Sequence, residues 1–268
     1  MQPKASLDDT LALMRDLRAR CSWDAAQTHD SLRPYLIEEA HELDDALREG
    51  DDRSIREELG DVLLQVLFHS VVAEERGSFD MGDVAHGLIA KMHARHPHLY
   101  GDGEKRSWEE MKAGTRKSIT DGLPSGLPAL HRAHRLQDRA AGVGFDWPDA
   151  EGPLEKVAEE LDEVKGVLGE ARPGGGANSG GGDRPDSGAA GAHLHDELEG
   201  ELGDLLFAVV NLCRKLDVHA GLALDRANAK FARRFTRIEE LARERGSEPR
   251  EMTLDELDAL WNEVKLGE

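Results

Sequence analysis

The chain has 268 residues, a formal net charge of −20 and only 4% aromatic residues. So acidic a surface repels nucleic-acid backbones and anionic membranes, and we expect neither as a partner. The sequence begins without a signal-peptide pattern and has no apolar run of the roughly 18 residues that span a membrane. Its two cysteines are too few for a disulfide framework, and we expect a cytoplasmic protein.

Helical periodicity dominates the first half of the chain. Leu, Ala, Glu and Arg are abundant, and no segment alternates polar and apolar residues as a surface strand does, which predicts an all-α fold. We expect Ser6 and Ser54 to be N-caps, Pro34 to lie in the first turn of its helix, and Trp23 to be buried in a loop at 21–28. The helices expected in this half cover residues 7–20, 31–49, 54–76, 80–95 and 108–117.

The second half repeats the order of the first. Expected helices cover residues 128–141, 153–170, 193–216, 220–245 and 254–265, and the segment 172–192 is rich in Gly, Ser, Ala and Pro, which predicts a disordered insertion. We therefore expect two tandem helical domains, 1–118 and 128–268, joined by a Gly- and Pro-containing linker at 119–127. Helices this short need partners to bury their apolar stripes, so helix-bundle packing follows.

The same acidic phrase occurs once in each half. Glu-Leu-Gly-Asp stands at 58–61 and again at 201–204, and each copy leads directly into an apolar run. Further acids precede each copy at helical spacing, where residues three and four apart share a face. The first set is Glu38, Glu39, Glu42, Glu57, Glu58 and Asp61, and the second is Glu159, Glu160, Glu163, Glu201 and Asp204.

Two such helices packed side by side would bring several carboxylates together. Without compensation these carboxylates would repel one another or take up protons, and a hard divalent cation removes the conflict. Ligation by oxygen alone favours Mg²⁺, with Mn²⁺ as an alternative, and either ion would let an acidic site hold a polyphosphate. A spare Glu can serve as general base for a metal-bound water.

Two other interpretations of the acids stay open at this point. The carboxylates can simply form solvated helix faces. Alternatively, Glu38 and His41 have the Glu-x-x-His spacing of di-iron carboxylate bundles, although the second half has no histidine at that register.

The sequence resembles the MazG family of nucleoside triphosphate pyrophosphohydrolases, in particular the long bacterial form with two tandem MazG domains. The family pattern, Glu-x-x-Glu followed by a spacer and Glu-x-x-Asp, is met once in each half, and the resemblance covers almost the whole chain. The pattern is matched by Glu39, Glu42, Glu58 and Asp61, and by Glu160, Glu163, Glu201 and Asp204. Further matches are residues 23–24, 27–28, 95–98, Trp108 with Lys112, 143–147, 227–228, 230–231, 233–235, and Trp261 with Lys265.

The resemblance implies hydrolysis of NTP or dNTP to the nucleoside monophosphate and pyrophosphate with magnesium, in an all-α homodimer. It also implies site residues in the second domain. The metal ligands would be Glu160, Glu163, Glu201 and Asp204, and the catalytic residues Glu159, Glu160 and Lys230. Substrate would be bound by Lys112, Glu159, Lys230, Arg233, Arg234, Trp261 and Lys265. A possible second site in the first domain would use Glu38, Glu39, Glu42, Glu57, Glu58 and Asp61.

Two departures from the family pattern bear on this assignment. Gly200 stands where the family commonly has another Glu and where the first half has Glu57, and the gap between Glu163 and Glu201 is lengthened by the Gly-rich insertion. A lost carboxylate leaves a second hypothesis open, in which the chain is a non-catalytic nucleotide-binding regulatory protein. A phosphoribosyl-ATP pyrophosphohydrolase on a similar helical fold is a further alternative.

Overall fold

The computed structural model describes residues 5–105, 108–113, 116–170 and 187–267, and it divides the chain into two compact units, Met1–Lys105 and Arg106–Glu268. The described residues are helical or irregular, and no strand occurs among them, which confirms the predicted all-α class. The division places residues 106–118 with the second unit, whereas the sequence suggested a boundary at 119–127. Each unit is described by itself below.

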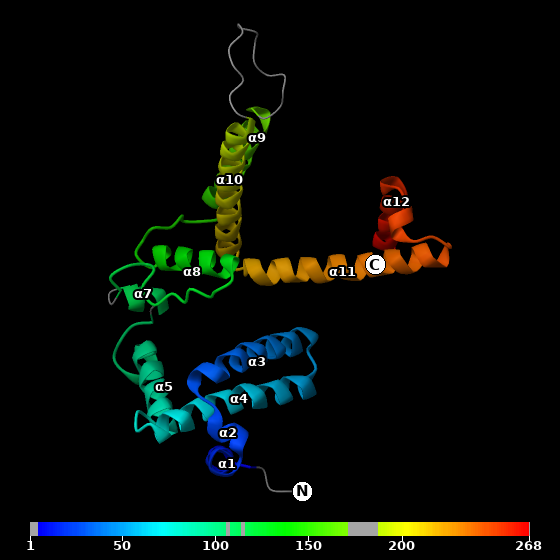
Figure 1. Cartoon of the computed structure of the whole chain (residues 1–268). Coiled ribbons are helices and arrows are strands. Elements are labelled where there is room, and N and C mark those ends of the chain that lie inside the picture. The colour runs from blue at the N-terminus through cyan, green and yellow to red at the C-terminus, as the bar shows by residue number, and fades with distance from the viewer. Residues whose placement is uncertain (1–4, 106–107, 114–115, 171–186, 268) are drawn as a thin grey trace. The chain divides into compact units, whose positions relative to one another are not determined.

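The first unit is built around a pair of long helices (Figure 1). Its elements are α1 (Leu7–Arg20), α2 (Ser22–Ala26), α3 (His29–Glu49), α4 (Asp52–Glu75), α5 (Met81–Arg95) and α6 (Pro97–Tyr100). Gly50, at a φ of +76°, turns the chain back between α3 and α4, which pack along each other as an antiparallel pair. The core gathers Met14, Leu32, Leu67, Phe68, Val71 and Val72 from α1, α3 and α4.

Several local expectations for this unit need correction. The expected loop at 21–28 contains α2, and Trp23 is 52% exposed, with its ring edge against Tyr35 and Phe68. Asp51, rather than Ser54, caps α4 by accepting a hydrogen bond from the Ser54 backbone N–H, because an aspartate three residues earlier was available. Since α3 begins at His29, Pro34 lies beyond its first turn.

The second unit contains two helix pairs. Its elements are α7 (Trp108–Ala113), α8 (Ala129–Ala141), α9 (Glu151–Glu170), α10 (Ser187–Lys215), α11 (Ala220–Glu244), a 3₁₀ turn at Pro249–Glu251 and α12 (Leu254–Leu266). The helices α9 and α10 pack along each other, and α8 packs against α10 and α11. The other pair is α11 and α12 (Figure 1). Their shared core is Ile238, Leu241, Ala242 and Leu260.

The predicted insertion falls largely on residues outside those that the structure describes. Positions 172–186 lie outside the described residues, and so do residues 114–115 of the helix predicted at 108–117. Residues 187–192 are helical, because α10 begins at Ser187, six residues before the start expected from the sequence. Cys21 and Cys213 are both free thiols. Across the described residues, no helix combines the length and apolarity needed to cross a membrane.

Candidate active site

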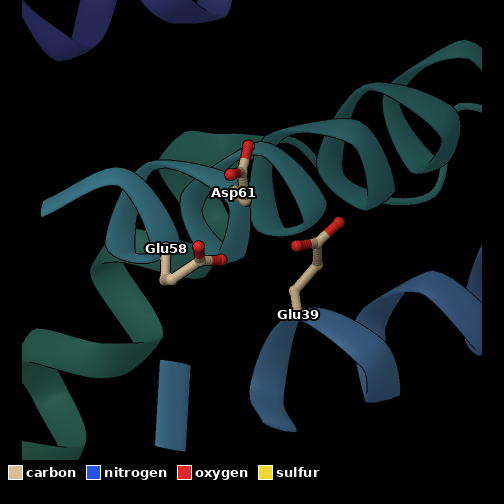
Figure 2. A group of neighbouring side chains, drawn as sticks. All are labelled: Glu39, Glu58 and Asp61. Carbon is tan, nitrogen blue, oxygen red and sulfur yellow. The ribbon is translucent and has the colours of Figure 1, made fainter. Parts of the chain in front are cut away.

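The first unit gathers three carboxylates from its central helix pair. Glu39 projects from α3 towards Glu58 and Asp61 of α4, and one oxygen of each lies within 4.8 Å of the others (Figure 2). We call these residues the first carboxylate cluster. The three carboxylates come together because α3 and α4 pack antiparallel. This packing places the helix face with the Glu-x-x-Glu pattern opposite the face with the Glu-x-x-Asp pattern.

The first carboxylate cluster is electrostatically strained. Burial raises the pKa of Glu39, and the charges of Asp61, Glu42 and Glu58 raise it further. The pKa of Glu58 is raised in the same way, by desolvation and then by Glu42 and Asp61. Such a group of like charges is favourable once a cation joins it.

The remaining predicted residues of the first site lie around this cluster. Glu42 is exposed and reaches Glu39 through a hydrogen bond between the two side chains. Glu57 is instead paired with Arg53 at 3.1 Å, and Glu38 is exposed. His41 is exposed too and belongs to neither carboxylate group, so the described residues give no support to a di-iron site.

The second unit has a matching group on α9 and α10. Glu160, Glu201 and Asp204 each offer an oxygen within 4.8 Å of the others, and we call them the second carboxylate cluster. Only 6% of the Glu160 side chain is exposed, so this carboxylate needs a positive partner. Glu163 lies beside the cluster, where a hydrogen bond with Glu201 and the charge of Glu160 raise its pKa.

Lys156 supplies that partner and was not singled out in the sequence. Its Nζ lies 2.5 Å from Glu160 and 3.0 Å from Glu159, and these two hydrogen bonds raise the pKa of the Lys156 ammonium. The sequence pattern that indicates this contact is Lys-x-x-Glu-Glu at 156–160, since residues three and four apart meet on one helix face. The corresponding position in the first unit, four residues before Glu39, is Tyr35, so the first cluster has no such lysine.

A pocket of about 420 Å³ adjoins the second carboxylate cluster. Glu160 and Asp204 form part of its lining, and the rest comes mainly from apolar side chains of α8, α10 and the loop at 142–150. The pocket is lined by Pro153 and Glu160 of α9 together with Asp204 and Asn211 of α10, so it lies along this helix pair.

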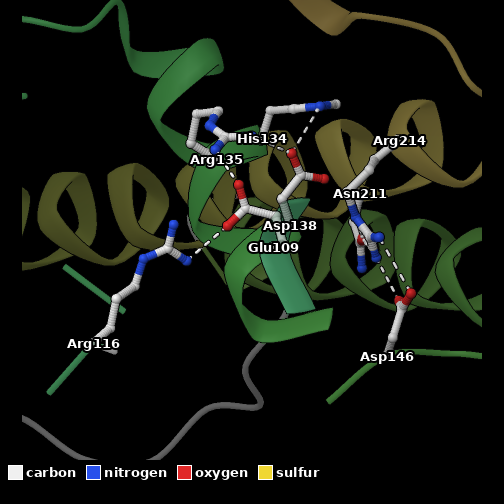
Figure 3. Close-up of polar contacts among 8 residues, drawn as sticks. All are labelled: Glu109, Arg116, His134, Arg135, Asp138, Asp146, Asn211 and Arg214. Carbon is white, nitrogen blue, oxygen red and sulfur yellow. Dashed lines mark hydrogen bonds and ion pairs between the residues drawn. The ribbon is translucent and has the colours of Figure 1, made fainter. Parts of the chain in front are cut away.

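Ion pairs join α7 to α8 and the loop at 142–150 to α10 (Figure 3). Glu109 of α7 accepts hydrogen bonds from Arg116 at 2.7 Å and from Arg135 of α8 at 2.5 Å. Burial alone would raise the pKa of Glu109, but these two guanidinium groups more than offset it and hold the pKa below its usual value. Asp146 of the loop is bound in the same manner by Arg214 of α10.

The basic and aromatic residues implied by the family pattern form a separate group. Lys230, Arg233 and Arg234 lie on α11, whereas Trp261 and Lys265 lie on α12. The Trp261 ring packs 5.5 Å from the Phe231 ring, and Arg234 lies 5.5 Å from the centre of the Trp261 ring. Neither these five residues nor Lys112 of α7 line the pocket beside Glu160, so their role in substrate binding stays a prediction.

The donor set of both clusters consists of carboxylate oxygens, which suits Mg²⁺ or Mn²⁺ and disfavours softer ions. Together with the helical fold, this defines a class: an all-α protein with paired helices that twice present carboxylates close enough to hold a metal ion. Residues 27–100 match the family model of the MazG nucleotide pyrophosphohydrolase domain.

Full-length relatives extend this match beyond the first unit. The chain is 42% identical over 270 residues to the nucleoside triphosphate pyrophosphohydrolase/pyrophosphatase MazG of Thermotoga maritima, covering 97% of this chain and 96% of that protein. It is 37% identical over 282 residues to the nucleoside triphosphate pyrophosphohydrolase of Escherichia coli K12, covering 98% of both. It is also 41% identical over 267 residues to the uncharacterized protein YabN of Bacillus subtilis, covering 95% of this chain and 50% of YabN. The chain therefore belongs to the MazG family of nucleotide pyrophosphohydrolases, which places it among the hydrolases.

Proposed function

We propose that this protein is a Mg²⁺-dependent nucleoside triphosphate pyrophosphohydrolase, which converts NTP or dNTP and water into the monophosphate and pyrophosphate. The observation that carries the proposal is the second carboxylate cluster, whose oxygens lie within 4.8 Å of one another and which shares Glu160 and Asp204 with the lining of a pocket. Family membership and the names of the full-length relatives support the nucleotide and the bond that is cleaved.

In this proposal Glu160, Glu201 and Asp204 bind the metal, with Glu163 beside them. Bound there, Mg²⁺ would lower the pKa of a water and neutralise charge on the phosphate oxygens. Glu159, which lies outside the cluster, accepts the proton of the attacking water. The new bond forms at the α-phosphorus, and the bond to the bridging oxygen breaks, so that pyrophosphate leaves.

Lys156 has a double role in this mechanism. Without metal its ammonium neutralises Glu160 at 2.5 Å. A divalent cation on Glu160 would take over that neutralisation and release the ammonium towards the phosphate oxygens, where a compact positive charge stabilises the transition state.

We propose a homodimer as the working form. The helix pairs carry exposed apolar side chains close to both clusters, including Ile37, Leu59, Leu161, Leu202 and Leu206. Apolar side chains exposed on a helix pair become buried when a second copy packs on that face. In a dimer, Lys230, Arg233 and Arg234 of α11 in one copy would contact the phosphates of a substrate held at the carboxylates of the other copy.

Pyrophosphate release from a panel of NTPs and dNTPs, with and without Mg²⁺, tests the proposal. The assay is run on the parent chain and on Asp61→Asn and Asp204→Asn, one substitution in each cluster. We expect release only with Mg²⁺ and a loss of more than about 100-fold in Asp204→Asn, because even groups that merely support metal ligands are worth 10- to 100-fold. Loss in Asp61→Asn alone would move catalysis to the first unit.

A non-catalytic nucleotide-binding regulator is the second candidate, and Gly200 is the observation that favours it. Its position, next to Glu201 on α10, lacks the carboxylate that Glu57 provides in the first unit. Mg²⁺-dependent nucleotide binding without pyrophosphate release would support this candidate. The phosphoribosyl-ATP alternative is disfavoured by the full-length similarity to nucleoside triphosphate pyrophosphohydrolases.

A further inference from the structure

Arg139 of α8 is a buried cation that contacts no carboxylate among the described residues. Only 7% of this residue is exposed. Its guanidinium donates from Nη1 to the backbone oxygens of Ile119 at 2.7 Å and Asp121 at 2.9 Å. Carbonyl oxygens accept these hydrogen bonds but carry no net charge, so the guanidinium lacks a counter-ion. Arginine is rarely buried unless it is paired, because a buried charge without a partner is costly.

The Nε–Nη2 edge of the Arg139 guanidinium has no partner in the part of the chain that the structure describes. Nε is buried and makes no hydrogen bond there, and both hydrogen bonds of the side chain leave from Nη1 instead. A buried donor without a partner is rare in folded proteins. Two N–H groups on one edge of a guanidinium match two oxygens of a carboxylate or a phosphate, so an oxyanion would satisfy this edge.

The carboxylates closest to Arg139 are engaged by other groups. Glu109 is paired with Arg116 at 2.7 Å and with Arg135. Asp121 accepts hydrogen bonds from two backbone N–H groups of its own loop, at 2.7 and 2.9 Å. Burial lowers the pKa of the Arg139 guanidinium, and the charge of Arg116 lowers it further. Positive charge at this place is therefore not fully compensated.

A pocket of about 120 Å³ lies beside Arg139. This volume corresponds to that of about four water molecules in the liquid and is well below the range for drug-sized ligands, so the pocket suits a small ion. Its lining has three cationic side chains and no acidic one. The lining residues are Arg116, Lys117, Ser118, Ile119, Arg139 and Val143.

This small pocket differs in character from the second carboxylate cluster. None of the three carboxylates of that cluster lines it, and Ile119 is the residue that it shares with the larger pocket of about 420 Å³. An anion at the carboxylates needs a metal ion to offset their charge, whereas the wall of the small pocket is itself positive. Within a chain of net charge −20, such a concentration of cations favours an anion as its ligand.

We infer that the small pocket is a binding site for a free orthophosphate ion, held by the Nε–Nη2 edge of Arg139 and by the Lys117 ammonium. Arg116 adds positive charge while it stays paired with Glu109. The bound ion would supply the counter-ion that Arg139 lacks and would fasten the loop at 116–121 to α8. The inference does not depend on hydrolysis at either carboxylate cluster.

Equilibrium dialysis of the full chain with radiolabelled inorganic phosphate tests the inference. A chelator removes divalent cations, so that no metal holds phosphate at the carboxylates, and about 0.15 M sodium chloride screens weak surface attraction. We expect saturable binding to the parent protein. Absence of saturable binding would overturn the inference.

Two substitutions assign the bound ion to this pocket. Arg139→Lys keeps a positive charge and a donor for the loop carbonyls but loses the guanidinium edge, so it should weaken phosphate binding about tenfold or more. Lys117→Met leaves the backbone N–H of residue 117 in place and should weaken binding about threefold. Lys165→Met, on the exposed face of α9 and outside the pocket, is the matched control and should bind as the parent does. Binding by both pocket variants equal to that of the control would place the ion elsewhere and refute the inference.

Thermal unfolding gives a readout that is independent of the dialysis. Saturating phosphate should raise the thermal midpoint of the parent protein, because a ligand of the folded state stabilises it, and should raise that of Arg139→Lys much less. Equal rises in the two proteins would contradict the role given to Arg139.

Ribose 5-phosphate distinguishes a free ion from a phosphate group carried by a larger molecule. It should bind more weakly than orthophosphate in the same dialysis, because the pocket has room for little more than the ion. Equal or tighter binding, lost in Arg139→Lys, would assign the pocket to a phosphate ester and contradict a site for the free ion.

Discussion

At the scale of single residues, the two carboxylate clusters differ in how their charge is compensated. Glu160 has Lys156 at 2.5 Å, whereas Tyr35 occupies the equivalent position before Glu39. Desolvation and neighbouring carboxylates consequently raise the pKa values of Glu39 and Glu58. Without a bound cation, these two carboxylates therefore take up protons more readily in the folded first unit than in the unfolded chain.

This has a consequence for the pH dependence of stability. Because the folded state binds more protons than the unfolded state between the ordinary and the raised pKa values, the free energy of unfolding falls as pH rises through that window. We predict that the thermal midpoint of metal-free protein falls as the pH rises above the ordinary carboxylate pKa, and falls less in Asp61→Asn, which removes one of the repelling charges. Calorimetry in the presence of a chelator measures this, and a steeper fall in Asp61→Asn would contradict the assignment.

At the same scale, Lys156→Met should separate the structural from the catalytic part of the lysine's role. We predict that turnover at saturating Mg²⁺ falls about tenfold or more, since a charge-assisted contact to phosphate is lost. KM for Mg²⁺ should not rise, because removal of a competing cation frees Glu160. Lys165→Met is the control, as Lys165 pairs with Asp162 on the exposed face of α9. A higher KM for Mg²⁺ in Lys156→Met would show that the lysine supports the metal site.

At the scale of elements, two glycines of the α9–α10 pair occupy opposite environments. Nothing lies within 4 Å of a Cβ added at Gly200, whereas the same addition at Gly152 meets three atoms of the Trp147 ring. There is room for a side chain at position 200, whereas a side chain at position 152 would clash with the Trp147 ring.

We therefore predict effects of opposite sign for the two alanine substitutions. Gly200→Ala should raise the free energy of unfolding by about 0.5–1 kcal/mol, because glycine weakens a helix interior. Gly152→Ala should lower it by about 1–3 kcal/mol through overpacking. Urea denaturation measures both changes. Stabilisation by Gly152→Ala would mean that the Trp147 ring does not rest on the helix start.

The elements also show where sequence reasoning succeeds and where it stops. The helix predicted at 7–20 matches α1 at both ends, and its start is recognisable because the capping pair, Ser6 and Asp9, is three residues apart. The cap of α4 was assigned to Ser54 instead of Asp51, because the stretch Asp-Asp-Arg-Ser offers competing caps. The antiparallel carboxylates followed from spacing, but the pocket did not, since its walls come from α8, a loop, α9 and α10.

At the scale of the whole molecule, dimerisation is the expectation that the family pattern adds. A stable interface buries at least about 1,000 Å², and the exposed apolar side chains of the helix pairs are the surface available for it. Each copy would then cover the apolar side chains around the carboxylate clusters of the other copy.

We predict that the protein sediments as a dimer and that Leu206→Glu shifts it towards monomer. Leu206 is 57% exposed on α10, two residues after Asp204. Leu254→Glu is the control, because Leu254 is 81% exposed at the start of α12. Sedimentation equilibrium should show dissociation only in the first variant, and a monomeric parent protein would refute the dimer.

The most direct test of the account is hydrolysis in water enriched in oxygen-18, with Mg²⁺ present. Attack of water at the α-phosphorus predicts that the label appears in the nucleoside monophosphate, that pyrophosphate is unlabelled, and that Asp204→Asn abolishes both products. Label in the pyrophosphate, or unchanged turnover in Asp204→Asn, would contradict a reaction centred on the second carboxylate cluster.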